Sequence, residues 1–505
     1  MLLAAVLGGG IARPVFAQDG APPAAPPPIA TIPSDGFNMK VVEQPTPYYV
    51  ITTLDPPVFN WFAGTFTNLP TDKEVTIGLS MNEMDHLINN ADVSKWAGLK
   101  PVMTYGDPTN YATYEWFEKD AQGRWVSSDP FKVGDARYAG TGKIPEQTVM
   151  PQEVAPVFLS ADGKRWSAWR EIDNTEALST LNIFRCKQRF LLPTATVAMR
   201  IPFTYTYLQE FLKRLRAAEL PEVFVDEIGT TQGQRQLQVI RLEGRQQTTI
   251  DTLRTVLVIA REHATETASS WALYGGLTAL LADTPEAAAL RKNTTWLFIP
   301  IQDPDGSANA TFDNLTSKMC HANDPNTPKE VFDYAQYFID KVNGKQSIDV
   351  SIVLHNVEAN ESPNLMCPFV DVRFPEQVVA FNTQLFDAAR AKGYQTTAPE
   401  MNYGKGWMNF RLYGWCALHF GTFDLAFEVN ECYPGNRLSI TQLTQLGGLL
   451  VQETGRWLAG TEGEQWHQHA RQVLEERAKK RAEFFKTRGN DPPQRSKTII
   501  LMRAY

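Results

Sequence analysis

The sequence is poor in cysteine, has no excess of basic residues and contains no long apolar run, and each shortage excludes a class of protein. Its five cysteines among 505 residues include no CxxC pair, so a thiolate metal site is not expected. The formal net charge of −8 disfavours a nucleic-acid partner, because neutralising phosphates requires a basic surface. No uninterrupted apolar stretch is long enough for a stable membrane span.

The first residues have the pattern of an export signal. Residues 1–7 are apolar, and Val15-Phe-Ala17 before Gln18 resembles a small-residue cleavage site, although the usual preceding basic residues are absent. We therefore expect residues 1–17 to be a signal peptide of an exported protein, periplasmic or secreted; a disordered apolar tail is the alternative. Residues 18–36, rich in Ala and Pro, are expected to form a stiff linker.

Export would permit disulfides, although the sequence cannot define their pairing. One or two could form, and an odd number of cysteines leaves at least one thiol free or paired with another molecule. The candidates are Cys186, Cys320, Cys367, Cys416 and Cys432.

The length of the chain predicts more than one domain. Residues 37–200 contain short β-rich runs, separated by Pro, Gly, Asn and Asp, which predict an all-β sandwich-like domain. Within it, residues 114–118 and 124–126 flank a candidate hairpin loop at 120–123. No recognisable catalytic set occurs in this part, so support is its simplest role and substrate selection the alternative.

After Arg200 the pattern changes to apolar strands that alternate with helices. This alternation over residues 201–460 predicts an α/β domain with a mixed sheet, whose ligand site lies at the carboxyl ends of the strands. Strands are expected at 238–242, 255–260, 296–300 and 350–354, and helices at 207–215, 267–282 and 328–342.

Residues 461–505 are expected to form a charged C-terminal helix and tail. The helix is predicted at 464–486, with a solvated charged face, and Trp466, Leu474 and Phe484 would dock it to the domain. His467 and His469 lie two residues apart, so they do not share a helical face, and both are expected at the surface.

Three chemically distinctive groups follow the predicted strand ends. His263 and Glu266 come after the strand at 255–260, His355 ends the strand at 350–354, and Glu428 lies in another β-rich run. Two His and one Glu with an open fourth position form an established catalytic zinc set. The HxxE spacing alone is a weak signal, because Glu266 could cap a helix and His355 could be a hydrogen-bonded core residue.

Several motifs, in order along the chain, resemble those of the metallocarboxypeptidase family (M14). REHATETASSW at 261–271 is similar to R-x-H-P-G-E-T-x-x-S-W, the zinc motif of the cytosolic carboxypeptidase branch. QDPDG at 302–306 resembles the family's N-P-D-G turn, LHN at 354–356 the segment with the third ligand, and LAFE at 425–428 the strand with the catalytic glutamate. The predicted β-domain before PFTYTY at 202–207 is also similar to that branch.

This resemblance implies a carboxypeptidase-type fold and a set of site residues. His263, Glu266 and His355 would hold one zinc ion, with water in the fourth position. Glu428 would be the catalytic general base that activates this water and later protonates the leaving amine. The implied substrate is a peptide.

The chain departs from the family pattern where the substrate is recognised. Lys318 stands where an oxyanion-stabilising arginine is expected, and lysine can supply that positive charge. Asn326 and Thr327 replace an Asn-Arg pair that grips the substrate's terminal carboxylate, and threonine lacks arginine's bidentate fork. Arg411, upstream of Glu428, is a candidate for binding an acidic substrate group; a structural salt bridge is the alternative.

Three functional interpretations remain open from the sequence. The first is a zinc carboxypeptidase acting on peptides or peptidoglycan-derived peptides. The second is a zinc-dependent deacylase or amidohydrolase acting on N-acyl amino acids. The third is a non-catalytic binding protein on a peptidase scaffold. The presence of all three ligands and of Glu428 favours the catalytic interpretations.

Overall fold

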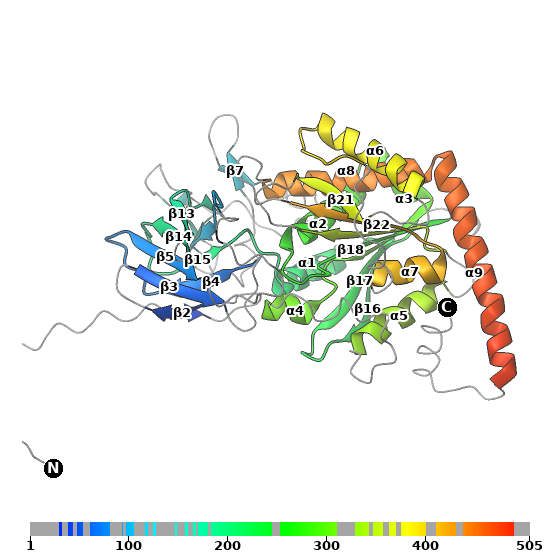
Figure 1. The fold of residues 1–505 in the computed structure, drawn as a ribbon, viewed down its shortest axis with the longest axis horizontal. Coiled ribbons are helices and arrows are strands. Elements are labelled where there is room, and N and C mark those ends of the chain that lie inside the picture. The colour runs from blue at the N-terminus through cyan, green and yellow to red at the C-terminus, as the bar shows by residue number, and fades with distance from the viewer. Residues whose placement is uncertain are drawn as a thin grey trace, which may run out of the picture.

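A β-sheet region and an α/β region lie side by side in the molecule, and the long helix α9 runs along the far edge of the second (Figure 1). The computed structural model describes residues 30–32, 39–43, 48–53, 61–80, 93, 97–105, 117–119, 125–127, 147–148, 157–159, 165–167, 170–179, 183–244, 253–310, 329–342, 347–356, 363–369, 375–399, 411–430 and 438–488.

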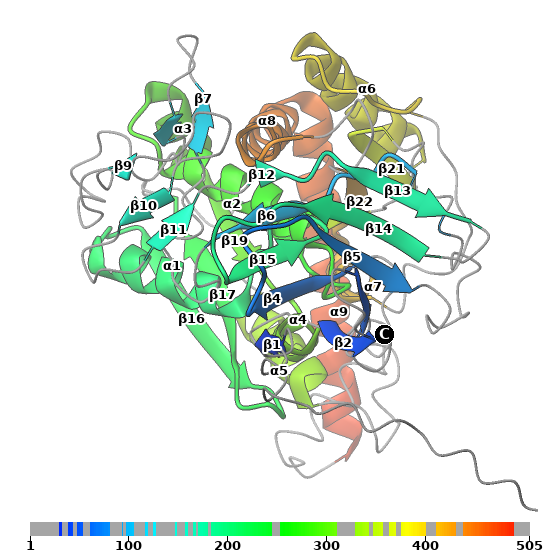
Figure 2. The same ribbon diagram turned by 90° about the vertical axis from the view of Figure 1, so that its left-hand side faces the viewer.

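The β-sheet region contains two larger sheets among its described residues, both visible in Figure 2. One has the spatial order β1 (Ala30–Ile32), β4 (Ala63–Thr67), β15 (Ala195–Ala198), β6 (Val102–Thr104) and β12 (Arg170–Glu171). The other has the order β13 (Thr175–Leu178), β14 (Ile183–Gln188), β5 (Val75–Ser80), β3 (Tyr48–Thr53) and β2 (Met39–Glu43). Phe62, next to β4, packs against Phe184 of β14 with ring centroids 6.4 Å apart, so the two sheets share a core.

Smaller sheets complete this region. β9 (Gln147–Thr148), β10 (Val157–Leu159) and β11 (Arg165–Ser167) form one, and β7 (Phe117–Lys119) pairs antiparallel with β8 (Trp125–Ser127). The β7–β8 pair is the expected hairpin; its loop lies outside the described residues. All the regular elements described before Arg200 are strands, which confirms the all-β character of the region.

The α/β region is built on a mixed sheet, as the sequence predicted. Its described strands have the spatial order β16 (Val223–Thr230), β17 (Gln236–Leu242), β19 (Thr294–Ile299), β18 (Arg254–Ala260), β20 (Val350–His355), β22 (Phe423–Val429) and β21 (Leu365–Phe369). The central strands β19, β18, β20 and β22 run parallel, whereas β17 and β16 on one side and β21 on the other pair antiparallel. The carboxyl ends of the parallel strands therefore meet at one edge.

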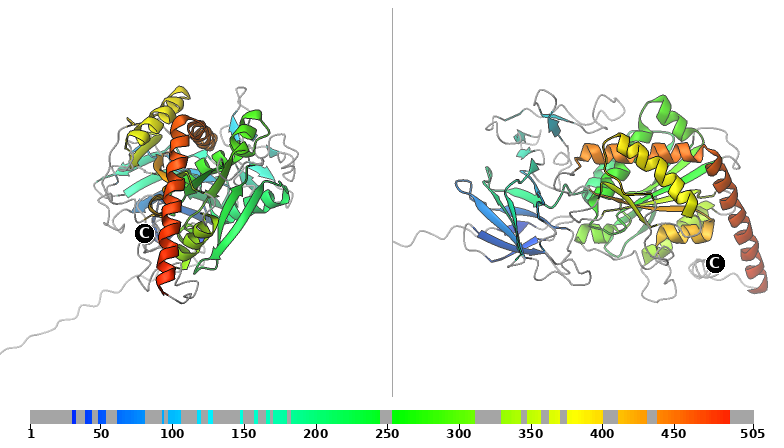
Figure 3. Two further views of the ribbon diagram at one scale, coloured as in Figure 1. Left: turned by 90° about the vertical axis from the view of Figure 1, so that its right-hand side faces the viewer. Right: turned by 45° about the horizontal axis from the view of Figure 1, so that its top comes forward.

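Helices cover both faces of this sheet: α6 and α8 lie on one side, and α5 and α7 on the other (Figures 1 and 3). The helices in the described part are α1 (Tyr205–Ala217), α2 (Thr267–Leu281), α3 (Pro285–Lys292), α4 (Pro304–Asn309), α5 (Lys329–Val342), α6 (Pro375–Ala391), α7 (Leu412–Phe420), α8 (Ile440–Leu458) and α9 (Thr461–Arg488). None of them is long and apolar enough to cross a membrane.

Strand β18 is apolar without interruption because it is buried on both faces of the sheet. Val256 and Val258 belong to the core cluster that includes α2 and α8, and Leu257 and Ile259 belong to the cluster that includes α5 and α7. Because neighbouring side chains of a strand point to opposite faces, a sheet buried on both faces requires an apolar residue at every position.

Helices α2 and α8 approach each other closely through glycines. A Cβ at Gly447 would lie 1.7 Å from the carbonyl oxygen of Ala272, and one at Gly275 would lie 2.0 Å from that of Thr444. Because the neighbouring atoms belong to the backbone of the other helix, both positions require glycine. The close contact fixes α2, whose amino end follows the HxxE turn.

The C-terminal helix α9 docks through Trp466 and Leu474 as expected, but one of its histidines is buried; the side chain of Phe484 lies outside the described residues. Trp466 packs on Phe423 with ring centroids 4.8 Å apart. The prediction of a surface His467 was wrong, because its Nδ1 lies 2.5 Å from Oδ1 of Asp349, and both side chains are buried. A buried carboxylate requires such a partner. His469 is half-buried.

Candidate metal centre

The turn between β18 and α2 carries two of the predicted metal ligands. It begins at Arg261, whose φ of 59° lies in the left-handed region. Its buried guanidinium donates to the carbonyl oxygens of Ala264 and Phe203 and to Oγ of Ser307. These bonds hold the turn in a conformation that arginine seldom adopts, and they place His263 and Glu266 at the carboxyl end of β18.

His263, Glu266 and His355 come together as a group that could hold a metal ion. Their ligand atoms all lie within 4.8 Å of one another. Nδ1 of His263 lies 2.7 Å from one carboxylate oxygen of Glu266, and Nδ1 of His355 lies 3.0 Å from the other. Both imidazoles therefore present the same nitrogen to the carboxylate. Their ring centroids are 4.9 Å apart.

The donor set fits zinc in chemistry and in charge. Two imidazoles and one carboxylate suit a zinc ion with an open position. Three buried carboxylates, Glu262, Glu266 and Glu428, gather around the site, and Arg411 is the cation that pairs with one of them. With His355 deprotonated for binding, a divalent cation would offset the negative charge that Arg411 does not. The prediction of a zinc cofactor agrees with this group.

Glu428 lies beside the metal group because of sheet register. His355 on β20 pairs directly with Glu428 on β22. The carboxylate is buried, and its Oε2 has no hydrogen-bond partner among the described residues. Burial raises the pKa of Glu428 above its usual range; His355 opposes this effect, and the negative charge of Glu266 adds to it. A carboxyl group in this position can hold a proton and release it.

Arg411 occupies the start of α7, at the edge of the metal group. Its Nη1 lies 3.1 Å from Oε2 of Glu262 and 3.3 Å from Nε2 of His263. Both expectations for Arg411 thus have a basis: it forms a structural ion pair, and it lies next to a predicted ligand. Lys318 and Asn326 lie outside the described residues.

Glu262 is a site residue that the sequence reasoning missed. Its side chain is fully buried, and its Oε2 lies 3.0 Å from Nε2 of His355. The contact is an ion pair without the alignment of a hydrogen bond. A charged residue between Arg261 and His263, at the end of an apolar strand, was the available signal.

The charges of this cluster stabilise one another. Burial alone would raise the pKa of Glu262 and Glu266, but Arg411 for the first, and His263 and His355 for the second, hold both values below the usual range. Burial alone would lower the pKa of His355, but the carboxylates of Glu266 and Glu262 raise it to about 10. In the metal-free protein the carboxylates are thus ionised and His355 carries a proton.

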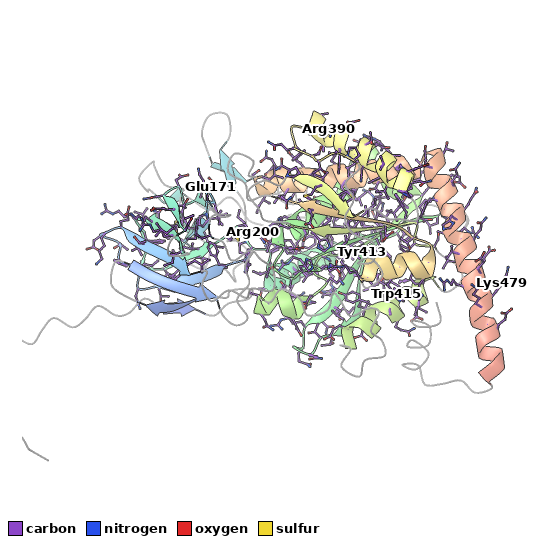
Figure 4. The ribbon with its side chains drawn as sticks, viewed as in Figure 1. Glu171, Arg200, Arg390, Tyr413, Trp415 and Lys479 are labelled. Carbon is purple, nitrogen blue, oxygen red and sulfur yellow. The ribbon has the colours of Figure 1, made fainter. Side chains whose placement is uncertain are left out.

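The β-sheet region contributes a buried arginine to the same turn. Arg200 lies just beyond β15, and Figure 4 places it where the two regions meet. Its Nη2 donates to the carbonyl oxygen of Thr265 (2.7 Å) and its Nε donates to Oγ1 of Thr267 (2.9 Å). These two residues flank Glu266, so the β-sheet region helps to hold a predicted ligand.

The three described cysteines, Cys186, Cys367 and Cys416, are all buried and form no disulfide with one another. Burial raises the pKa of the Cys186 thiol to about 12. Cys320 and Cys432 lie outside the described residues.

Comparison with known sequences supports the same assignment. Residues 208–361 match the zinc carboxypeptidase family model, and this stretch includes the three predicted ligands but ends before Glu428. Cytosolic carboxypeptidase 1 of Danio rerio is 27% identical over 121 residues, 22% of this chain and 10% of that protein. Cytosolic carboxypeptidase 6 of Homo sapiens is 30% identical over 111 residues, 21% of each chain. The chain thus matches about a fifth or less of the length of these curated relatives.

Solved structures share the fold over most of the chain. A metallo-carboxypeptidase from Burkholderia cenocepacia has a TM-score of 0.58 at 17% identity, covering 84% of this chain and 97% of that one. A metallo-carboxypeptidase from Pseudomonas aeruginosa, in complex with (2-guanidinoethylmercapto)succinic acid, has a TM-score of 0.56 at 15% identity, covering 84% and 98%. Residues 208–361 therefore match the zinc carboxypeptidase family model, and the chain has the fold of the metallo-carboxypeptidases, with a His-Glu-His group able to hold a metal.

Proposed function

We propose that the protein hydrolyses peptide bonds as a zinc metallocarboxypeptidase, acting on peptides or peptidoglycan-derived peptides. The observation that carries the proposal is the position of Glu428. This buried carboxylate lies directly across the strand pair from His355, beside a group able to hold a metal, and its Oε2 has no hydrogen-bond partner within the described part of the chain. A site that only bound zinc would not need this second carboxylate.

The proposed roles follow from the positions of the side chains. His263, Glu266 and His355 would hold the zinc, which when bound supplies Lewis-acid polarisation and an acidified water. Glu428 would take the proton from the attacking water and deliver it to the leaving amine. Its burial in the sheet fixes its position, so this proton transfer needs no rearrangement of the side chain.

Substrate recognition is the part of the proposal in which this chain departs from the family pattern. Arg411 supplies a fixed positive charge at the edge of the metal group, and we assign to it the attraction of an acidic substrate group. Lys318 would stabilise the oxyanion and Asn326 would contact the substrate. Because Thr327 lacks a guanidinium, we expect a weaker requirement for a free terminal carboxylate than an Asn-Arg pair would impose.

The test uses the full chain, its zinc content and a peptide mixture analysed by mass spectrometry. We expect one zinc per chain and stepwise loss of C-terminal residues. Glu428→Gln should keep the zinc and lower kcat by at least about 10²-fold. Glu376→Gln, an exposed change on α6, is the control and should leave both unchanged.

Other outcomes of this test separate the alternatives. Zinc binding with hydrolysis of N-acyl amino acids instead of peptides would support the deacylase. Zinc binding without any hydrolysis would support a binding protein. A folded protein that takes up no zinc would overturn the catalytic proposal.

We also propose that the protein is exported, on the basis of the apolar residues 1–7 and the candidate cleavage site after Ala17. These residues lie outside the described part of the chain. N-terminal sequencing of the protein from separated cell fractions tests this, with a mature chain that begins at Gln18 as the expected result. An uncleaved chain in the cytoplasm would contradict it.

A further inference from the structure

We propose that Glu262 is a positioning residue of the metal site, which orients His355 for the metal and holds Arg411 next to His263. The inference rests on the proposed function, because it concerns the zinc ligands named there. Glu262 itself would touch neither the metal nor the substrate.

The burial of Glu262 requires an explanation. Its carboxylate is 0% exposed, and burying a charge is costly unless it is paired. Oε2 contacts two partners, Nε2 of His355 at 3.0 Å and Nη1 of Arg411 at 3.1 Å. Such a buried ion pair is often no more stabilising than apolar residues of the same volume. Stability alone therefore does not account for a glutamate at this position.

The contact with His355 decides which ring nitrogen is available to a metal. Nδ1 of His355 faces Glu266, and Nε2 faces Glu262. A neutral imidazole carries one proton, and an ionised carboxylate can only accept it. The negative charge of Glu262, 3.0 Å from Nε2, favours the proton of a metal-bound His355 at Nε2, and the lone pair of Nδ1 is left for the metal. Carboxylates that contact the distal nitrogen of a ligand histidine act in this way in zinc sites.

Loss of Glu262 would remove the buried negative charge that faces Nε2 of His355 at 3.0 Å. The imidazole would lose a contact that fixes its orientation, and its Nδ1 would be a weaker metal ligand.

The same carboxylate also links the second imidazole. Arg411 is held by Glu262 at 3.1 Å, and the same Nη1 lies 3.3 Å from Nε2 of His263. Glu262 thus reaches His355 directly and His263 through Arg411. Loss of Glu262 would therefore also change the electrostatic surroundings of His263.

The chain offers a matched control at the other end of β20. Asp349, immediately before the strand, pairs with His467 at 2.5 Å, and both side chains are buried. It is also a carboxylate–imidazole pair, but it lies about 20 Å from His355, given six residues of extended strand. Removing the charge of Asp349 should therefore lower the stability of the protein without affecting the metal site.

The experiment measures zinc affinity by competition with a chromophoric chelator, without substrate, for the full-length protein. Glu262→Gln and Glu262→Ala are compared with wild type and with Asp349→Asn. We expect the affinity to fall about 10-fold for the amide and up to about 100-fold for alanine, and to stay within about 2-fold for Asp349→Asn. With cobalt in place of zinc, the visible spectrum should change in the Glu262 variants only.

The outcomes are separable from those for the proposed function. If folded Glu262→Gln and Glu262→Ala bind zinc as tightly as wild type, the inference is overturned, while the zinc peptidase proposal stands. If the wild type binds no zinc, the proposed function itself fails. If the single variants do not fold, Glu262→Met combined with Arg411→Met removes both charges of the pair; a folded double variant with wild-type affinity would also overturn the inference.

Discussion

At the scale of single residues, the neighbours of a buried histidine determine its charge more than burial does. His355 and His419 are both almost completely buried. Two carboxylates raise the pKa of His355 to about 10. Burial, reinforced by the positive charge of Arg477, lowers the pKa of His419 to about 3. One imidazole is therefore charged at neutral pH in the metal-free protein, and the other is neutral.

The His419 environment predicts a pH-dependent stability. Above about pH 6.5 His419 is neutral in both the folded and the unfolded protein, so it does not affect stability. Below that pH the unfolded chain binds a proton, whereas His419 in the folded chain stays neutral down to about pH 3. Stability should therefore fall with decreasing pH, by up to about 1.4 kcal/mol per pH unit from this group. His419→Gln should reduce this slope in urea unfolding between pH 7 and 4.5; equal slopes in both proteins would contradict the prediction.

The role of a residue could be predicted from the sequence where the residue lies in a motif. It could not be predicted where it depends on the packing of segments that are distant in the chain. His263, Glu266 and His355 were identified because the motifs around them resemble those of the metallocarboxypeptidases, since their spacing alone is a weak signal, and the structure brings them together. Glu262 has no such pattern, and its partners are distant in the chain. His467 was misplaced because helical periodicity does not reveal that Asp349 lies beneath it.

At the scale of helices and strands, the contact between α2 and α8 positions the metal turn. Gly447→Ala should destabilise the protein by about 3 kcal/mol, because the added Cβ would meet the carbonyl oxygen of Ala272 at 1.7 Å, and backbone cannot rotate away as a side chain can. Gly448→Ala is the control, since its Cβ would meet the Ala279 side chain at 3.3 Å and the carbonyl oxygen of Gly275 at an ordinary contact distance of 3.9 Å. Thermal unfolding compares the two; equal stabilities would show that the helices can separate without cost.

The sheet was easier to predict than the helices that cover it. The apolar runs at 255–260 and 350–354 indicate strands buried on both faces, and they are β18 and β20. The prediction did not include α7 or α8. Helix α7 is apolar over most of its length, so its sequence shows no helical period. Helix α8 contains Gly447 and Gly448, which disfavour helix formation locally, and tertiary packing overrides that preference.

At the scale of the whole molecule, the β-sheet region reaches into the metal turn through Arg200. We predict that Arg200→Met lowers zinc affinity by up to about 10-fold, because the carbonyl oxygen of Thr265 and Oγ1 of Thr267 lose their buried donor beside Glu266. The free energy of unfolding should also fall, by about 1–3 kcal/mol, because the buried hydrogen bonds of Arg200 are lost.

A control for Arg200 lies in the same region. Arg185 on β14 pairs with Glu176 in a partly exposed contact, and such contacts contribute little. Arg185→Met should therefore leave zinc affinity unchanged in the same chelator competition. If Arg200→Met behaves like Arg185→Met, the β-sheet region has no influence on the metal turn.

The left-handed conformation of Arg261 has a consequence for which substitutions this position can accept. Its φ of 59° favours glycine, but its guanidinium bonds with Ala264, Phe203 and Ser307 require an arginine. Glycine would relieve the backbone and lose every one of these bonds, and lysine could replace at most a part of them. In a saturation library selected for zinc-dependent activity, we expect all active variants to carry arginine at position 261. Active variants with glycine would mean that the conformational freedom of the backbone outweighs the side-chain contacts.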